Sequence, residues 1–283
     1  MYSQFMVKKT VKQSATSSHR KDANTIDAFH LKALEDQVLW VTGASGGLGP
    51  GICRKLHNAT GMKFALHARS NQKVAEQIVN EIRDDGGTAL VTLGDLSKKD
   101  IASNAVARIH ASLGNVYGLL HLAGPYVQKP VGDHTRAEFD SMIHGNLTSF
   151  FECVKAVLPD LRLQRHGSRV IGMGMAGAQH TTPMLSHGPH LAAKSGLIAL
   201  ARTLALEEAK YNITVNVIAP GHIVNKDIER ETARETSATL SHPMGVHGSY
   251  EDIADAILYL LSPAASYVTG AVLDVSGGWR QPE

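Results

Sequence analysis

A run of closely spaced glycines near the start of the chain has the composition of a phosphate-binding loop. Gly43, Gly46, Gly47 and Gly49 follow the apolar stretch 38–41 and precede a segment that is apolar on one side and basic on the other. This order predicts a strand, a tight turn and a helix, which together aim backbone N–H groups and a helix N-terminus at an anion. Glycine suits the turn because a Cβ would keep the backbone away from a pyrophosphate.

The spacing of these glycines, Gly43-x3-Gly47-x-Gly49, differs from the G-x-G-x-x-G of the commonest dinucleotide-binding fingerprint. A glycine-rich turn between a strand and a helix also occurs where no nucleotide binds. The loop therefore predicts a phosphate site only if the elements around it form a nucleotide-binding fold.

Strand-like and helix-like patterns alternate from residue 37 to the end of the chain. Apolar, β-branched runs predict seven strands, at 38–42, 63–67, 89–92, 117–122, 169–173, 214–218 and 271–275. The segments between them predict helices at 47–57, 71–84, 98–113, 135–158, 192–210 and 250–261. This alternation, without an internal repeat, predicts an α/β domain with a parallel sheet covered on both faces. Right-handed crossovers make such a fold doubly wound, with its ligand at the carboxyl ends of the strands.

Length and composition limit the classes of protein to which the chain can belong. Its 283 residues, of which 19% are charged, suffice for one large α/β domain. No apolar run is long enough to cross a membrane, and no hydrophobic signal segment opens the chain. Residues 1–36 carry six Lys and Arg against four Asp and Glu, which accounts for the whole net charge of +2. The neutral remainder has no basic footprint, so we expect neither a nucleic acid nor a membrane as a partner.

The N-terminal part differs in character from the rest. Residues 1–24 are polar and predict a flexible arm, and residues 25–36 can form a short helix. We expect residues 37–283 to form a single domain, which the motifs described next imply is a Rossmann-type dinucleotide-binding and catalytic domain. Cys53 and Cys153 fall in predicted helices and offer no disulfide framework, which favours a reducing, cytoplasmic location.

From residue 37 onward the chain resembles the short-chain dehydrogenase/reductase family, whose members are single-domain Rossmann enzymes that use NAD or NADP. The resemblance rests on motifs in the family's order and spacing: Thr42-Gly43-x3-Gly47-x-Gly49, Asp95-Leu96, Ala123-Gly124, Asn146, Lys194, Pro220-Gly221 and Gly277-Gly278. It implies an oxidoreductase that acts on a small-molecule substrate. Because relatives pair the helices matching 135–158 and 192–210 across a subunit interface, it also implies a homodimer or homotetramer.

The resemblance implies a set of cofactor-binding residues in the loops that follow the strands. They are Gly43, Ser45, Gly46, Gly47, Leu48, Gly49, Arg69, Ser70, Asp95, Leu96, Ala123, Gly124, Lys194, Pro220, Gly221 and Ile223. The family usually has Asn-Asn-Ala-Gly where this chain has His121-Leu122-Ala123-Gly124. Asn225 stands where the family often has Thr.

The end of the second predicted strand bears on the choice of cofactor. An acid there accepts a hydrogen bond from the ribose 2′-hydroxyl of NAD, whereas a basic group favours the 2′-phosphate of NADP. The segment Leu66-His67-Ala68-Arg69-Ser70 has no acid, and Arg69 can pair with a phosphate through two hydrogen bonds. A solvated arginine at a strand end is the alternative interpretation. We expect NADP(H), with NAD still possible.

The residues expected to do chemistry match the family only in part. In the family a Tyr supplies a proton, a Lys four residues later lowers its pKa and holds the ribose, a Ser orients the carbonyl and an Asn holds a proton-relay water. Lys194 and Asn146 match, but His190 stands at the Tyr position and Gly174 at the Ser position. Ser186 lies too far along the chain to replace that Ser. A nearby Lys⁺ disfavours imidazolium, so His190 is expected to be mostly neutral, with one N–H left to donate.

These departures leave several functions open. The chain can reduce a carbonyl with His190 as donor, or a conjugated C=C bond, as dienoyl-CoA reductases of this fold do without the Tyr at that spacing. In enoyl-acyl carrier protein reductases the Tyr stands seven residues before the Lys, and here that position is His187. The alternative function is a catalytically impaired cofactor-binding protein, which acts as a sensor or as a heteromeric partner. A nucleic-acid-binding Rossmann protein has only the basic arm in its favour.

Six histidines fall in segments expected near the substrate mouth: His180, His187, His190, His222, His242 and His247. Two imidazoles and a carboxylate can bind zinc. No acid lies between residues 174 and 194, however, so we expect these histidines to contact substrate or to lie in loops, with no metal bound.

Overall fold

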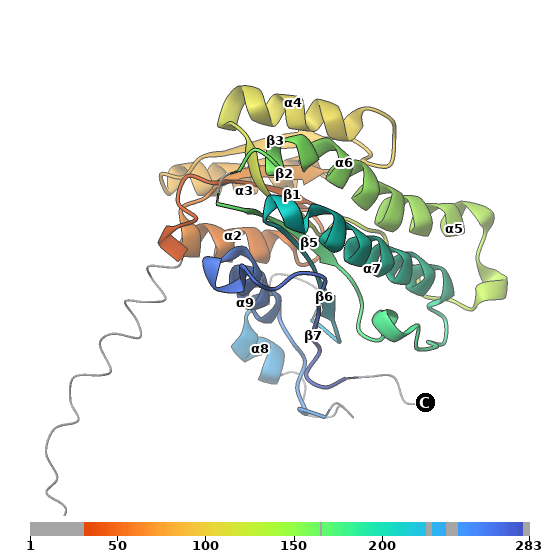
Figure 1. Ribbon diagram of the computed structural model, residues 1–283. Helices are drawn as coiled ribbons and strands as arrows, with labels where there is room; N and C mark the ends of the chain where they lie inside the picture. Colours follow the sequence, from red (N-terminus) through yellow and green to blue (C-terminus); the bar gives the residue numbers. More distant parts are fainter. Residues whose placement is uncertain (1–30, 165, 225–227, 236–242, 280–283) are drawn as a thin grey trace, which may run out of the picture.

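The computed structural model describes residues 31–164, 166–224, 228–235 and 243–279. The predicted arm at 1–24, the first half of the short helix expected at 25–36, Asn225 and His242 lie outside these residues. Seven parallel strands form one sheet in the order β3-β2-β1-β4-β5-β6-β7 (Figure 1). The strands are β1 (Val38–Thr42), β2 (Lys63–Ala68), β3 (Ala89–Leu93), β4 (Val116–His121), β5 (Ser168–Met173), β6 (Ile213–Pro220) and β7 (Val272–Val275).

Helices cover both faces of this sheet. The α-helices are α2 (Gly49–Thr60), α3 (Gln72–Asp84), α4 (Ile101–Leu113), α5 (Arg136–Ile143), α6 (Ser149–Leu161), α7 (Gly188–Glu208), α8 (Arg230–Glu235) and α9 (Tyr250–Leu261). Short 3-10 turns occur at Val131–Asp133, Ala178–His180, Ala209–Tyr211 and Pro263–Ala265. The doubly wound Rossmann-type fold that the alternating pattern predicts is confirmed.

Two separate apolar cores lie on the two faces of the sheet, because successive strand residues point to opposite sides. Val38 and Trp40 pack on one side with α4, α6 and α7. Leu39 and Val41 pack on the other side with α2, α3 and α9. All four strand side chains are buried, which accounts for the continuous apolar run in the sequence.

The helix expected at 135–158 is not continuous. It consists of α5, a π-helical turn at His144–Thr148, and α6. The extra residue of a π-turn shifts the side chains that follow it around the helix axis. Asn146 lies within this turn and is buried.

Two other segments also differ from the sequence-based expectation. Helix α7 begins at Gly188, four residues earlier than expected, with Pro189 in its first turn, where proline is favoured. The short helix α8 was not expected, because its six residues are too few to show a helical period. No helix in the described part of the chain is long and apolar enough to cross a membrane.

Candidate functional site

A cavity of about 360 Å³ opens at the carboxyl ends of β1, β2, β3 and β4. It is lined by Gly43, Ser45, Gly46, His67, Arg69, Ser70, Asn71, Gly94, Asp95, Leu96, Ala123, Gly124, Pro125, Gly145 and Ser149. A second cavity of about 300 Å³ shares part of this wall and adds Gly47, Leu48, Gly49, Ile52, Leu122 and Met173. The expected loop residues from the first four strands therefore meet around one space.

Several glycines in these walls have no room for a side chain. Gly43 has φ +72°, and a Cβ there would lie 2.7 Å from the Ala123 nitrogen. A Cβ on Gly49 would lie 2.5 Å from the Ala44 carbonyl oxygen. The chain thus approaches itself closely at the end of β1, which leaves the backbone of the turn exposed toward the cavity.

Arg69 and Ser70 lie at the end of β2 and border the first cavity. Asp95 is the single acid among the described residues that line it. Its burial raises the pKa of the Asp95 carboxyl, but hydrogen bonds from Ser97 and the positive charges of Lys98 and Arg69 outweigh this effect, and the pKa is lowered. Asp95 is therefore an ionised group held in place by the residues after β3.

A larger cavity of about 580 Å³ adjoins the glycine loop at Leu48 and extends over β5 and β6. It is lined by Leu48, Tyr126, Gln128, Gly174, Met175, His187, His190, Pro220, Gly221, His222, Ile223 and Trp279. None of these described lining residues is Asp, Glu, Lys or Arg, so the cavity suits an uncharged polar or apolar group.

Lys194 and Asn146 are buried and are not among the residues lining these three cavities. The Lys194 Nζ donates a hydrogen bond to the Met173 carbonyl oxygen at 2.7 Å, which ties α7 to the end of β5. Burial lowers the pKa of Lys194 to about 8. An ammonium group has three N–H donors, so others remain for a ligand.

Asn146 projects from the π-helical turn toward the end of β4. Its Nδ2 donates to the carbonyl oxygens of Pro125 (3.0 Å) and Met142 (2.9 Å). Its Oδ1 is buried and has no hydrogen-bond partner. A Cβ on Gly124 would lie 2.0 Å from this oxygen, so glycine is required beside it.

Comparisons with known proteins agree with this architecture. A family model described as enoyl-(acyl carrier protein) reductase matches residues 43–280. The chain is 34% identical over 250 residues to 3β-hydroxysteroid dehydrogenase 1 of Eggerthella lenta, a match that covers 87% of this chain and 94% of that protein. It is 30% identical over 240 residues to the 3-oxoacyl-[acyl-carrier-protein] reductase FabG of Staphylococcus epidermidis, covering 84% of this chain and 96% of FabG.

The chain belongs to the short-chain dehydrogenase/reductase family. Two solved structures of similar proteins extend the comparison. A dehydrogenase/reductase from Sinorhizobium meliloti 1021 has a TM-score of 0.78 at 27% identity and covers 90% of this chain and 98% of that one. A blue fluorescent protein from a metagenomic library, in complex with NADPH, has a TM-score of 0.76 at 28% identity and covers 87% and 98%.

His190 is the residue that the sequence resemblance places at the family's tyrosine position. Burial lowers the pKa of His190 to about 3, and the charges of Lys194 and His187 act in the same direction. A hydrogen bond to the Pro125 backbone acts against this shift. Because proline has no N–H, that bond must run from a ring N–H to the carbonyl oxygen. The Nδ1 atom of His190 is buried without a hydrogen-bond partner, so the ring is a neutral imidazole with one N–H.

Gly174 is the residue that the sequence resemblance places at the family's serine position. A Cβ there would lie 2.7 Å from Val217 Cγ1 and 3.3 Å from the Ile218 carbonyl oxygen. Val217 is buried, and its β-branched side chain cannot easily move away. Ser186 is not among the residues lining the cavity, and its carbonyl oxygen accepts a hydrogen bond from the Lys129 backbone.

His121, which stands where the family usually has the first asparagine of its Asn-Asn-Ala-Gly motif, is fully buried. Its Nδ1 lies 2.9 Å from Thr42 Oγ1, and its Nε2 lies 3.2 Å from Ser149 Oγ. Burial lowers the pKa of His121 to about 3, helped by the charges of Lys194 and His67. His121 thus links β1, β4 and α6 as a neutral imidazole.

The other histidines do not form one cluster. His187 and His222 line the larger cavity, and the His222 ring lies against that of His247, with centroids 4.3 Å apart. His180 is exposed after β5. Among the described residues, no group of three or more potential ligands could hold a metal ion.

Four residues that line the larger cavity are not expected from the sequence: Tyr126, Gln128, Met175 and Trp279. Tyr126 and Gln128 directly follow Ala123-Gly124 at the end of β4, so their place at a strand end was an available signal. Trp279 follows Gly277-Gly278, one of the motifs that identify the family.

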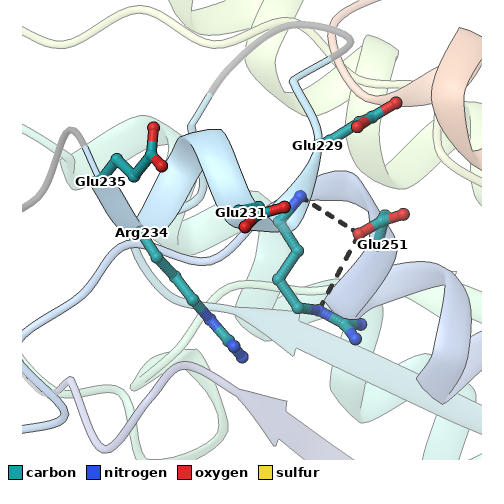
Figure 2. Close-up of a pocket in the computed structure, with 6 residues that line it drawn as sticks. Glu229, Glu231, Arg234, Glu235 and Glu251 are labelled. Carbon is teal, nitrogen blue, oxygen red and sulfur yellow. Dashed lines mark hydrogen bonds and ion pairs between the residues drawn. The ribbon is translucent and has the colours of Figure 1, made fainter.

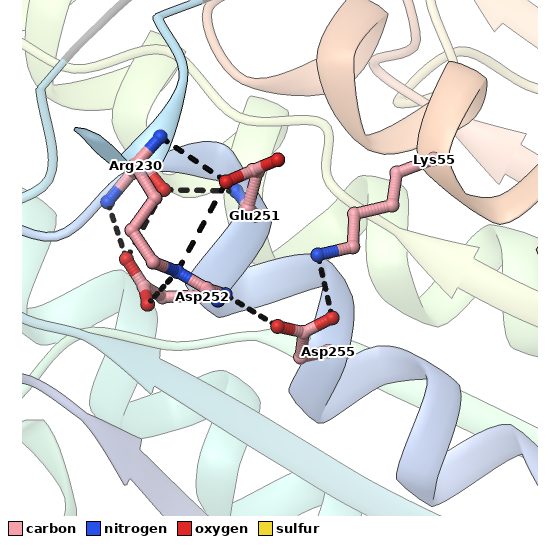
Figure 3. A network of polar contacts seen from close by, with 6 residues as sticks. Lys55, Arg230, Glu251, Asp252 and Asp255 are labelled. Atoms are coloured by element: carbon pink, nitrogen blue, oxygen red, sulfur yellow. Dashed lines mark hydrogen bonds and ion pairs between the residues drawn. The ribbon is translucent and has the colours of Figure 1, made fainter. Parts of the chain in front are cut away.

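Another open pocket, of about 690 Å³, lies beside α8 and is lined by Glu229, Arg230, Glu231, Arg234, Glu235 and Glu251 (Figure 2). Its walls are charged surface side chains, and it shares no residue with the glycine-loop cavities, so we assign the function to those. Arg230 pairs with Asp252 at 2.9 Å and also with Asp255, which binds Lys55 at 2.6 Å (Figure 3). These ion pairs connect α8 through α9 to α2.

Proposed function

We propose that the protein is an NADP(H)-dependent reductase that transfers a hydride to a small carbonyl or conjugated enone or enoyl substrate. The observation that carries the proposal is a row of three adjoining cavities: the 360 Å³ cavity shares Gly43 and Gly124 with the 300 Å³ cavity, which meets the larger cavity at Leu48. The two ends of this row differ in character. One end has a glycine-rich wall with Arg69 and Ser70, and the other has no Asp, Glu, Lys or Arg in its described lining. A dinucleotide phosphate suits the first, and an uncharged carbonyl suits the second.

The residues around the first cavity fit NADP(H). Gly43, Gly49 and Gly124 leave no space for a Cβ, so the backbone can approach a pyrophosphate. Arg69 stands at the end of β2 without an acid beside it at 68 or 70, which favours a 2′-phosphate. When bound, the cofactor would supply a hydride from its nicotinamide.

The remaining proposed contacts follow from the positions of the side chains. Asp95 and Leu96 would frame the adenine, and Pro220, Gly221 and Ile223 would face the nicotinamide from the side of the larger cavity. Lys194 would hold the nicotinamide ribose with the N–H groups that Met173 does not use. Asn146 would hold a water with its partnerless Oδ1. His190 would act as a neutral acceptor beside the substrate.

The relatives support both kinds of substrate. Two of them are named for reactions at a 3-oxo or 3-hydroxy group, and the family model is described by an enoyl reductase. A panel of ketones, enones and acyl thioesters, followed by NADPH absorbance, tests the proposal. Turnover of at least one class is expected. NADPH binding without turnover of any class would contradict it.

A second candidate is a cofactor-binding protein without turnover, which acts as a sensor or a heteromeric partner. The crowding at Gly174 and the partnerless Nδ1 of His190 favour it, because the family's serine and tyrosine have no direct substitutes at their own positions. In that case Lys194→Ala weakens NADPH binding, although no substrate is consumed. Calorimetric titration of wild type and variant separates this candidate from an inactive preparation that binds nothing.

We also propose that the chain forms a homodimer or homotetramer through α6 and α7. Phe151 on α6 is 46% exposed and Leu206 on α7 is 82% exposed, which leaves large apolar side chains at the surface. Light scattering during gel filtration gives the mass directly. The two free, buried cysteines, Cys53 and Cys153, support the proposed cytoplasmic location.

A further inference from the structure

We propose that Tyr126 is the proton donor of the reductase, and that His187 returns the proton to it. The inference rests on the proposed function and names the acid that the reaction needs. Tyr126 lies in the segment after β4, whereas the family's tyrosine position lies on α7 and holds His190. The Tyr126 phenol after β4 would therefore take the role of the tyrosine that α7 lacks at position 190, within the same cavity.

The larger cavity contains few groups that can donate a proton. His190 is neutral, and its Nδ1 is buried without a hydrogen-bond partner. Lys194 donates to Met173 and is not among the residues lining the cavity. Gly174 has no side chain, and no serine fits there beside Val217. His222 also lines the cavity, with its ring packed against that of His247. Among the described lining residues, Tyr126 and His187 are the two acid–base groups that lie within hydrogen-bond distance of one another and can pass a proton.

Tyr126 is held where it can serve this role. Its Oη lies 2.8 Å from His187 Nε2 and 3.1 Å from Gln128 Oε1. Its ring meets the His190 ring edge to face, with centroids 5.0 Å apart and planes at 77°. Burial raises the pKa of Tyr126, so the phenol keeps its proton near neutral pH. The neutral His190 ring thus packs against the Tyr126 ring and holds it in position.

The hydrogen bonds of His187 allow it to supply a proton. Its Nδ1 lies 2.6 Å from the Leu185 carbonyl oxygen, which can only accept, so Nδ1 carries a hydrogen. In the neutral ring, the Nε2 lone pair then accepts a hydrogen bond from the Tyr126 hydroxyl. In the imidazolium, Nε2 carries a hydrogen and donates a hydrogen bond to Tyr126 Oη. In the second state the phenol proton is free to point to Gln128 or to a substrate oxygen in its place.

The proposed step balances in atoms and charge. The substrate carbon gains a hydride from NADPH, and its oxygen, as alkoxide or enolate, takes the Tyr126 proton. The phenol O–H bond breaks and a substrate O–H bond forms. The phenolate then takes the Nε2 proton of the His187 imidazolium, which becomes neutral with its hydrogen on Nδ1. Solvent restores the imidazolium through the open cavity, and the oxidised cofactor leaves with the positive charge.

The test compares Tyr126→Phe with wild type in the complete protein, using the substrate that the panel identifies. The phenylalanine ring keeps the contact with His190, so the fold and the NADPH dissociation constant should not change. The loss of a positioned acid should lower kcat by about 10²- to 10⁴-fold. Tyr267→Phe, at a fully exposed tyrosine, is the matched control and should keep wild-type kcat.

The role of His187 requires a second measurement. His187→Asn should lower kcat in the wild-type background while KM and NADPH affinity stay the same. It should lower kcat no further in the Tyr126→Phe background, because the two groups act as one unit. An additional loss in the double variant, or a changed KM alone, would mean that His187 only shapes the cavity.

The outcomes separate this inference from the proposed function. If wild type turns over and Tyr126→Phe keeps its kcat while His190→Ala loses it, Tyr126 is not the donor and the inference is wrong. If wild type binds NADPH but reduces nothing in the panel, the proposed function fails, and the inference fails with it.

Discussion

Acidification should destabilise this protein because it buries two neutral histidines. The pKa values of His121 and His190 are both lowered to about 3, whereas a histidine in an unfolded chain titrates near about 6.5. Below about pH 6.5 His121 and His190 therefore bind protons in the unfolded chain but not in the folded protein. The stability that these groups contribute is complete above that pH and is lost progressively as the pH falls toward 3.

The magnitude follows from linkage. For one such histidine the loss at pH 5 is RT ln(1 + 10^1.5), or about 2 kcal/mol. His121 and His190 together should cost about 4 kcal/mol at pH 5, a large share of the roughly 5–15 kcal/mol that stabilises a typical domain. The charges nearest His121 are those of Lys194 and His67, and both oppose its protonation.

The contribution of His121 can be isolated with His121→Asn. Urea unfolding, followed by tryptophan fluorescence, gives the free energy of unfolding of each protein at pH 7 and pH 5. Several carboxyl groups with lowered pKa, such as those of Glu81 and Asp255, also weaken the fold in acid, so only the difference between variant and wild type is informative. The variant should lose about 2 kcal/mol less than wild type between the two pH values.

The exposed His180 offers the control. His180→Asn is expected to keep the acid sensitivity of wild type. If His121→Asn loses as much stability between pH 7 and pH 5 as wild type does, then His121 accepts a proton in the folded protein. The assignment of a neutral, buried imidazole between Thr42 and Ser149 would then be wrong.

Three further predictions follow from other parts of the structure. Arg69→Ala should weaken NADPH binding by about 10- to 100-fold and leave NADH binding nearly unchanged, as measured by calorimetry; equal affinity of wild type for both cofactors would contradict it. Gly174→Ser should lower the free energy of unfolding by about 1–3 kcal/mol, because its side chain overlaps Val217. Adding Val217→Ala should recover part of this loss. If the effects of the two substitutions simply add in the double variant, the side chains do not overlap. Arg230→Ala should cost about 1 kcal/mol at low salt, mainly through Asp255, and less in 1 M NaCl; a loss independent of salt would show that packing, not charge, holds α8.

Much of the fold could be predicted from local patterns. Each buried strand is a short apolar run, and the turn after β1 needs glycine because Gly43 has positive φ and Gly49 touches the Ala44 carbonyl. Such requirements arise between residues that are close together in the chain, so local sequence patterns reveal them. The helix at 135–158 was harder to predict, since apolar periodicity does not distinguish a continuous helix from one interrupted by the π-turn at His144–Thr148.

The departures at Gly174 and His190 were visible in the sequence, and so was the direction in which Lys194 shifts the pKa of His190. Their consequences were not visible. The expectation that His190 has an N–H to donate depends on the partner of that N–H, and the Pro125 carbonyl lies 65 positions earlier in the chain. The space at Gly174 depends on Val217, which β6 brings beside β5.

The sequence by itself determined the α/β class, the doubly wound parallel sheet and the glycine-rich loop, because period, turn chemistry and motif spacing are properties of adjacent residues. Only the tertiary structure decided which groups meet in the larger cavity. Tyr126 and His187 are 61 positions apart, and no local signal joins them, yet β4 and the segment before α7 place their polar atoms 2.8 Å apart. A proton donor is defined by such a distance and by the partners of each nitrogen and oxygen, and both arise only when distant segments pack together.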